Sequence, residues 1–257
     1  MENGKWTMNN LQSNIKLINY KIMTAFMGEV TGTALLIILG DGVVANVALT
    51  KTKGYSGGLI SVTFGWSMAV FVGVYVSAAA SGGHLNPAVT IALAYAGKFN
   101  WNDVPAYIIA QFIGAIIGAF LVWLAYKQHF DETEDANIKL GVFCTAPAKR
   151  NRLHNFITEF IGTFVFMFAV LSITKSSASL GSLDALPVAL VVLAIGLSLG
   201  GPTGYAINPA RDLGPRIVHF FLPIKNKRDS DWSYSWIPVV APITGGLLAA
   251  IIYQLIV

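Results

Sequence analysis

The tripeptide Asn-Pro-Ala occurs twice in the chain, as Asn86-Pro87-Ala88 and as Asn208-Pro209-Ala210. Asparagine is a preferred N-cap residue, and proline is favoured at the first helical position because its missing N–H would have no partner there. The two copies therefore predict helix starts, one for residues 87–96 and one for residues 209–221. A capping asparagine uses its side-chain oxygen on its own helix, which leaves its NH₂ group free to donate a hydrogen bond into a cavity.

The residues before each helix start are predicted to be non-helical. They follow apolar stretches, and because unpaired carbonyls cannot face lipid, such backbone inside a membrane must line a water-filled cavity. Two converging helix N-termini add positive partial charge, which disfavours cations and favours a neutral solute that carries hydroxyl groups. We expect pore-lining backbone carbonyls at Gly82, Gly83, His84, Leu85, Gly204, Tyr205, Ala206 and Ile207.

Hydropathy predicts the elements that position these residues. Of the 257 residues, 54% are hydrophobic and 12% are charged, with a mean hydropathy of +0.61, whereas soluble domains carry about 25% charged residues. A helix that crosses a bilayer needs about 20 mostly apolar residues. Two shorter segments, residues 84–97 and 209–222, cannot cross alone. The six predicted spans cover residues 22–47, 57–80, 104–126, 156–174, 185–201 and 232–257.

The two halves of the chain repeat each other. FMGEVTGT at residues 26–33 resembles FITEFIGT at 156–163, and SGGHLNPA at 81–88 resembles TGYAINPA at 203–210. Each half thus holds three spans and one short Asn-Pro-Ala segment, and an odd number of spans turns the second copy upside down. We predict an all-α membrane protein of six transmembrane helices and two re-entrant half-helices, with inverted repeats at residues 22–126 and 156–257.

With the paired motifs SGGHLNPAVT and TGYAINPARD, residues 22–257 resemble the major intrinsic protein family, which comprises aquaporins and glycerol facilitators. The resemblance implies a single transmembrane channel domain over residues 1–257, a right-handed bundle, and a homotetramer with one pore in each subunit. It also implies a multi-pass plasma-membrane protein with cytoplasmic termini, residues 1–21 included. Counting the Lys and Arg residues of the loops favours the opposite orientation, and we follow the resemblance.

The resemblance assigns a selectivity filter to four residues, Trp66, Gly196, Tyr205 and Arg211. Water-specific members carry histidine at the position of Gly196, so its absence implies a wider constriction. Trp66 and Tyr205 would form an apolar corner for a carbon chain, and Arg211, with five donors in a fixed arrangement, would bind hydroxyls on the opposite side. These residues predict a passive channel for glycerol and other small neutral solutes together with water.

Three acids need an interpretation. Asp212 resembles the glycerol-conducting subgroup, although Tyr205 stands where many bacterial glycerol facilitators have Phe, and Gly83 is commoner in water channels. Glu29 and Glu159 lie within apolar spans, where an acid indicates a functional site by default. Their repeat-related positions favour a structural role instead, and the resemblance implies that each accepts hydrogen bonds from the re-entrant loop of its own half.

Two other functions remain open. One is a water-selective aquaporin, and the other is an ion-coupled secondary transporter of a small polar solute, since inverted repeats with broken helices are also typical of carriers. The junction offers Asn86 and Asn208 rather than a titratable group, which favours the channel. The sequence shows no nucleophile beside a base, no phosphate loop, no metal cluster and no basic stripe. We therefore expect no enzyme activity, cofactor, metal or nucleic-acid partner, and take glycerol, water and the lipid bilayer as the partners.

Overall fold

A computed structural model describes residues 23–173 and 181–256. The predicted cytoplasmic segment, residues 1–21, lies outside the described residues, as do the outermost residues of three predicted spans, namely 22, 174 and 257. All six predicted spans form helices that are long and apolar enough to cross a membrane, which confirms the predicted fold class. They are α2 (Ala25–Ala48), α3 (Gly58–Ser81), α5 (Val104–Glu132), α7 (Arg152–Ser172), α8 (Leu186–Thr203) and α10 (Ile237–Ile256).

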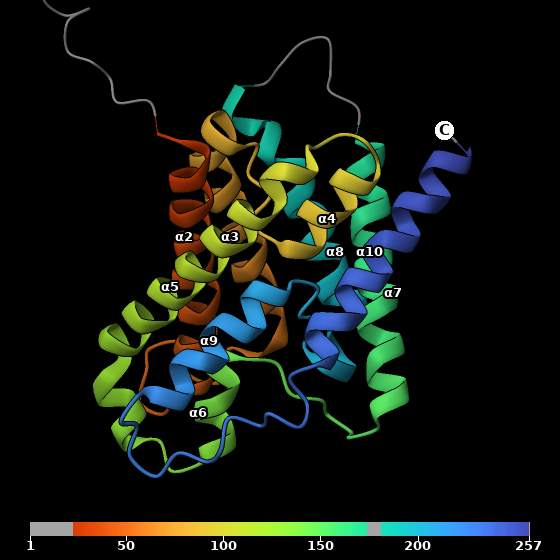
Figure 1. Cartoon of the computed structure of the whole chain (residues 1–257). Helices are drawn as coiled ribbons and strands as arrows, with labels where there is room; N and C mark the ends of the chain where they lie inside the picture. Colours follow the sequence, from red (N-terminus) through yellow and green to blue (C-terminus); the bar gives the residue numbers. More distant parts are fainter. Residues whose placement is uncertain (1–22, 174–180, 257) are drawn as a thin grey trace, which may run out of the picture.

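The two short segments form the half-helices α4 (Pro87–Tyr95) and α9 (Pro209–Phe221), close to the predicted bounds. Each has proline in its first turn and an asparagine at its N-cap whose side chain accepts from the helix backbone. Both begin near the middle of the molecule and run toward opposite ends (Figure 1). Neither is long enough to span a bilayer alone, since about 20 residues are needed.

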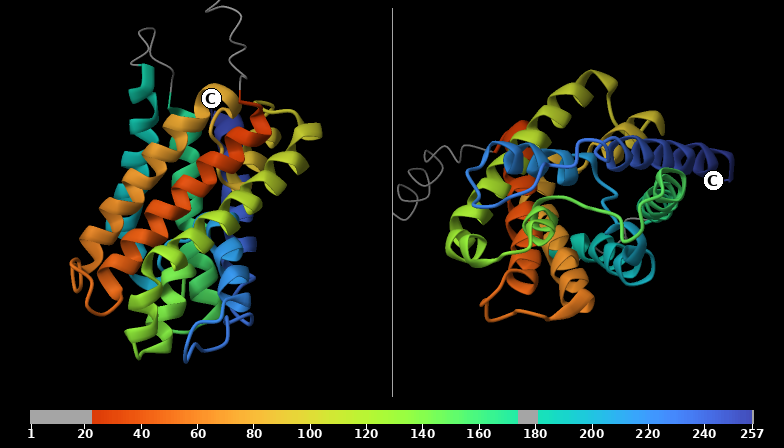
Figure 2. Two further views of the ribbon diagram at one scale, coloured as in Figure 1. Left: turned by 90° about the vertical axis from the view of Figure 1, so that its left-hand side faces the viewer. Right: turned by 90° about the horizontal axis from the view of Figure 1, so that it is seen from below.

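The helices of each half lie together. Seen along the molecule's long direction, α2, α3 and α5 occupy one side and α7, α8 and α10 the other (Figure 2). The half-helices exchange sides, because α4 packs against α10 and α9 packs against α5. The N-termini of α4 and α9 are thereby brought together between the two halves.

Two predicted boundaries lie five or more residues from those of the structure. The span predicted to end at residue 126 continues in α5 to Glu132, and the helix α6 (Ala136–Phe143) follows. The extension of α5 is stabilised by the Lys127–Asp131 pair, spaced four residues apart, and by the buried Phe130.

The last span also begins later than predicted, at Ile237 instead of residue 232. Pro238 stands in its first turn, where proline is favoured because its missing N–H needs no partner. This proline is the sequence signal for the true start.

Candidate functional site

The N-termini of α4 and α9 are joined by their capping asparagines. Asn86 Oδ1 accepts from Ala88 N at 2.9 Å, and Asn208 Oδ1 accepts from Ala210 N at 3.0 Å. Each amide also reaches across: Asn86 Nδ2 donates to Ile207 O at 2.9 Å, and Asn208 Nδ2 donates to Leu85 O at 2.8 Å. The expectation of a wholly free NH₂ is therefore corrected. One N–H of each amide holds the facing loop, which leaves the other for a solute.

The backbone before each half-helix is non-helical, as predicted, over residues 82–85 and 204–207. Gly82 and Gly204 have φ values of 83° and 81°, the left-handed region that glycine adopts without a steric penalty. Leu85 and Ile207 also have positive φ, 52° and 43°. Non-glycine residues in this region cost about 1–3 kcal/mol each and persist only where their surroundings hold them.

Glu29 supplies that support in the first half. Its carboxylate accepts from the backbone N–H groups of His84 at 2.9 Å and Leu85 at 2.8 Å. The Ser81 hydroxyl and the Gln111 amide donate to the same carboxylate, each at 2.7 Å. With four donors on two oxygens, the fully buried carboxylate is well satisfied as an acceptor and fixes the loop.

Glu159 occupies the matching position in the second half. It accepts from the backbone N–H groups of Ala206 and Ile207, each at 3.0 Å, and from the Thr203 hydroxyl at 2.7 Å. The two acids therefore make repeat-related contacts with the two loops. Neither carboxylate borders the cavity described next.

A cavity passes between the two halves where the loops meet. Its volume is about 150 Å³, and since one water needs only about 10–15 Å³ by the same measure, a solute of several heavy atoms can fit. Most of the predicted pore-lining residues border it, namely Gly82, Gly83, His84, Leu85, Tyr205, Ala206 and Ile207, together with Asn86, Asn208, Trp66 and Arg211. Gly204, Gly196, Pro87, Ala88, Pro209 and Ala210 are not among the described residues that border it.

The rest of the cavity wall is apolar and was not predicted. Its residues come from α2, α3, α4, α7 and α8, and they are Leu36, Val70, Val74, Val89, Leu93, Phe166, Val170, Val188 and Val192. The cavity lining therefore combines residues of the two non-helical loops with a larger set of aliphatic and aromatic side chains. Such a passage suits a solute that has hydroxyls on one edge and C–H groups on the other.

Trp66 and Arg211 lie against each other at one part of this cavity. The guanidinium carbon of Arg211 stands 4.1 Å from the centroid of the Trp66 ring, a cation–π distance. The ring is seated on Gly40 of α2, where an added Cβ would collide with it. Gly40 was not singled out from the sequence, although a glycine is what allows the ring to approach α2 so closely.

Gly196 lies directly beside the Tyr205 ring. An added Cβ there would meet Tyr205 Cζ at 2.9 Å and would lie still closer to the Thr63 methyl group. A Cβ added at Gly200, one turn further along α8, would meet Tyr205 Cδ1 at 2.6 Å. The Tyr205 ring thus lies on a surface of α8 that two glycines leave free of side chains.

The His84 side chain is packed among aromatic residues. Its ring contacts Phe99 and Tyr107 with centroid separations of 4.7 and 5.0 Å. Its Nδ1 lies 3.1 Å from the Thr90 hydroxyl.

Asp212 has partners that the sequence interpretation did not find. Its Oδ1 accepts from Arg216 Nε at 2.9 Å and Nη2 at 2.7 Å, and its Oδ2 accepts from the backbone and hydroxyl of Thr145. Arg216 is fully buried and also donates to the Ser230 carbonyl. The spacing of four residues on one helix was the available signal for the pair.

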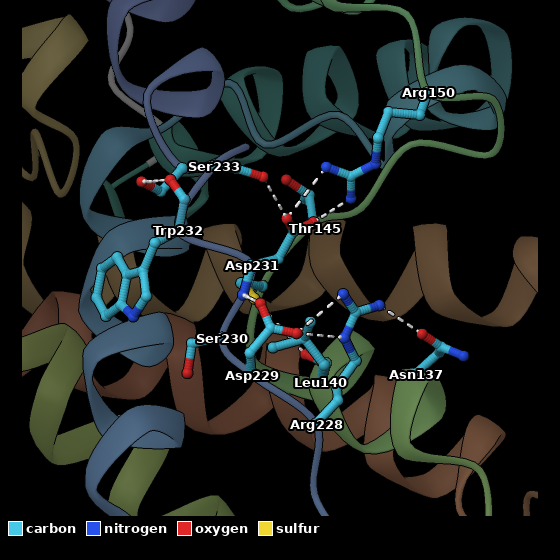
Figure 3. A network of polar contacts seen from close by, with 12 residues as sticks. Asn137, Leu140, Thr145, Arg150, Arg228, Asp229, Ser230, Asp231, Trp232 and Ser233 are labelled. Atoms are coloured by element: carbon cyan, nitrogen blue, oxygen red, sulfur yellow. Dashed lines mark hydrogen bonds and ion pairs between the residues drawn. The ribbon is translucent and has the colours of Figure 1, made fainter.

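The same end of the molecule holds a second ion pair, between Arg150 and Asp231 (Figure 3). Burial acts to raise the pKa of Asp231, but the hydrogen bond and charge of Arg150 outweigh it and hold the pKa below its ordinary value of 3.8. Together the two ion pairs fasten the segments 144–151 and 222–236 to α9.

Asp41 lies inside a predicted span, and sequence reasoning assigned it no role. It lies in α2, directly after Gly40, and its side chain is fully buried. Its Oδ1 stands 3.9 Å from Arg211 Nη1. Among the described residues, no group of three or more His, Cys, Asp or Glu side chains is arranged to hold a metal ion.

Comparison with known proteins adds independent findings. The sequence profile of the family described as "Major intrinsic protein" matches residues 16–253. The "Probable glycerol uptake facilitator protein" of Thermotoga maritima is 55% identical over 232 residues, which cover 90% of this chain and 99% of that protein. The "Glycerol uptake facilitator protein" of Bacillus subtilis is 52% identical over 232 residues, which cover 90% of this chain and 84% of that protein. The X-ray structure of the aquaglyceroporin from Plasmodium falciparum matches with a TM-score of 0.81 at 33% identity, covering 90% of this chain and 95% of that one.

Proposed function

Because the chain belongs to the major intrinsic protein family, we propose that it is a passive channel that conducts glycerol and other small neutral solutes together with water. The named glycerol uptake facilitators among its relatives support glycerol as the solute. The observation that carries the proposal is the cavity where the two loops meet, whose lining combines loop residues, Asn86, Asn208 and Arg211 with aliphatic and aromatic side chains. A polyol presents the same two kinds of surface.

The selectivity filter of this channel would consist of Trp66, Tyr205, Arg211 and Gly196. Gly196 would contribute by leaving the space that the Tyr205 ring occupies against α8. Arg211 would donate to hydroxyls, and the Trp66 ring would contact the C–H edge of the solute. The ring of Tyr205 lies back on Gly196 and Gly200 of α8, and this position would leave room for a carbon chain. A water-selective filter would be expected to be narrower.

At the junction of α4 and α9, the remaining N–H of Asn86 and of Asn208 would donate to the solute. The two helix N-termini add positive partial charge there, which opposes the passage of cations and protons. Carbonyls of residues 82–85 and 205–207, which border the cavity, would accept from solute hydroxyls as these pass. Glu29 and Glu159 would serve as loop anchors, and Asp212 would hold the segments 144–151 and 222–236 through Arg216.

The chain is a multi-pass membrane protein with six spanning helices, and it resides in the plasma membrane. We propose that it assembles as a homotetramer with one pore in each subunit and with cytoplasmic termini. Large apolar side chains on the outer surface, such as Ile60 and Phe64 of α3, are exposed in the single chain. Lipid and neighbouring subunits would cover them.

Stopped-flow light scattering of proteoliposomes tests the proposal. Vesicles that contain the protein should take up glycerol faster than empty vesicles, with a rate that rises linearly with the gradient and does not depend on pH. A flux that saturates and requires a proton gradient would show a carrier instead. Rapid water flux without glycerol flux would show a water-selective channel.

A further inference from the structure

Asp41 is an unusual residue for its location. It lies within a membrane-spanning helix and its side chain has no solvent exposure. Neither of its carboxylate oxygens has a hydrogen-bond partner among the described residues. An ionised carboxylate in such a place is strongly unfavourable unless an opposite charge compensates it.

The compensating charge is the guanidinium of Arg211. Its Nη1 is 3.9 Å from Asp41 Oδ1, which is too long for a hydrogen bond and within the range of an ion pair. This Nη1 is itself buried and, in the described part of the chain, has no hydrogen-bond acceptor. Each of the two buried groups therefore has the other as its charged neighbour.

The acid next to Arg211 in sequence does not take this role. Both oxygens of Asp212 are occupied, one by Arg216 and the other by Thr145. Glu159 is likewise committed to the loop that precedes α9. Asp41 is thus the acid whose carboxylate remains for the arginine.

One turn of α2 therefore supports two parts of the filter. Gly40 provides the surface on which the Trp66 ring lies, and Asp41 faces the guanidinium that lies over the same ring. A guanidinium that is attracted toward α2 stays against the wall of the passage. Without that attraction, its long side chain could extend across the passage and narrow it.

We propose that Asp41 is a positioning residue of the filter, which holds Arg211 against Trp66 and so keeps the passage wide enough for a carbon chain. The inference rests on the proposed function, because it assigns the width of the filter for glycerol to this ion pair. It predicts that loss of the charge at Asp41 affects glycerol more than the smaller water molecule.

The test is the ratio of glycerol to water permeability in proteoliposomes, which does not depend on how much protein is inserted. For Asp41→Asn we expect the ratio to fall about fivefold or more, as for other directly coupled pairs. Asp41→Glu retains the carboxylate and should keep the ratio well above that of the Asn variant. Asp131→Asn, which removes a half-exposed acid at the end of α5, is the matched control and should leave the ratio unchanged.

The outcomes separate this inference from the proposed function. If the wild type conducts no glycerol, the proposed function fails. If the wild type conducts glycerol and Asp41→Asn has the wild-type ratio, only the role of Asp41 is overturned. If Asp41→Asn does not fold, the double variant Asp41→Asn with Arg211→Val is the test. Recovery of folded protein in the double variant supports the inference that the two charges compensate each other. Continued misfolding of the double variant overturns that inference.

Discussion

Replacing Gly196 with alanine tests whether the Tyr205 ring sets the width of the passage. The new Cβ would stand 2.9 Å from Tyr205 Cζ, and closer still to the methyl group of Thr63. Carbon atoms in ordinary contact are about 3.5–4.0 Å apart. The ring must therefore move by roughly 0.6 Å or more. Since α8 lies behind it and the cavity in front, the ring moves into the cavity that it borders.

The magnitude follows from the cost of overpacking. An extra methyl group in a close-packed site costs about 1–3 kcal/mol. If about 1.4 kcal/mol of this appears as an added barrier when a carbon chain passes Tyr205, glycerol permeability falls about tenfold. Water is smaller than the narrowed gap, so its permeability should fall much less. The glycerol-to-water ratio is the quantity to follow, and Gly196→His should lower it further.

The assay uses stopped-flow measurements on proteoliposomes, with glycerol and sucrose gradients applied to the same preparation. Gly201→Ala is the matched control, because it makes the same change in the same helix at a position where an added Cβ meets nothing within 4 Å. The reasoning is refuted if Gly196→Ala and Gly201→Ala have the same ratio. An equal fall of both permeabilities would also refute it, since that result indicates fewer folded channels.

Three further predictions concern the groups that hold the loops. Glu29→Gln replaces an acceptor of four hydrogen bonds with an amide, so the free energy of unfolding in detergent should fall by at least about 1–3 kcal/mol. An unchanged unfolding midpoint would argue against the anchoring role of Glu29. Asp212→Asn leaves the buried Arg216 without its carboxylate at a cost of about 3–5 kcal/mol, while the glycerol-to-water ratio of the protein that still folds should stay at the wild-type value. The pKa of Asp231 is lower in the folded protein than its ordinary value of 3.8, so the pair with Arg150 stabilises the fold above about pH 4 and this contribution is lost as the pH falls through the folded pKa. Thermal unfolding followed from pH 6 to pH 3 should accordingly show a smaller acid-induced loss for Asp231→Asn than for the wild type.

The helices could be predicted from the sequence because their signals are local. About 20 apolar residues suffice to indicate a span, and Asn86-Pro87 and Asn208-Pro209 mark helix starts by capping chemistry alone. The end of α5 was missed because its last turns are polar. There the Lys127–Asp131 pair and the buried Phe130 outweigh the composition of the segment.

The support behind the filter could not be predicted in this way. The contact of Gly40 with Trp66 and that of Asp41 with Arg211 join α2 to distant parts of the chain, and no local pattern in the sequence encodes them. The same holds for Tyr205 on Gly196, because a glycine in an apolar helix usually indicates only close helix packing. The signal that was present is Asp41 itself, a carboxylate in a membrane span with no counterpart in the other half.

Differences between the two halves indicate which end of the passage selects the solute. Since α4 and α9 run toward opposite ends (Figure 1), residues at equal distances from Asn86 and Asn208 belong to opposite parts of the cavity. Three residues after each asparagine stand Val89 and Arg211, and twenty residues before each stand Trp66 and Val188, all four of which border the cavity. Valine can contact a solute but cannot orient its hydroxyls, whereas arginine and tryptophan together distinguish the two edges of a polyol. The loops and their acid anchors are alike in both halves. The filter is not, because its charge, Arg211, comes from the second half, whereas its aromatic ring, Trp66, and the buried acid Asp41 come from the first.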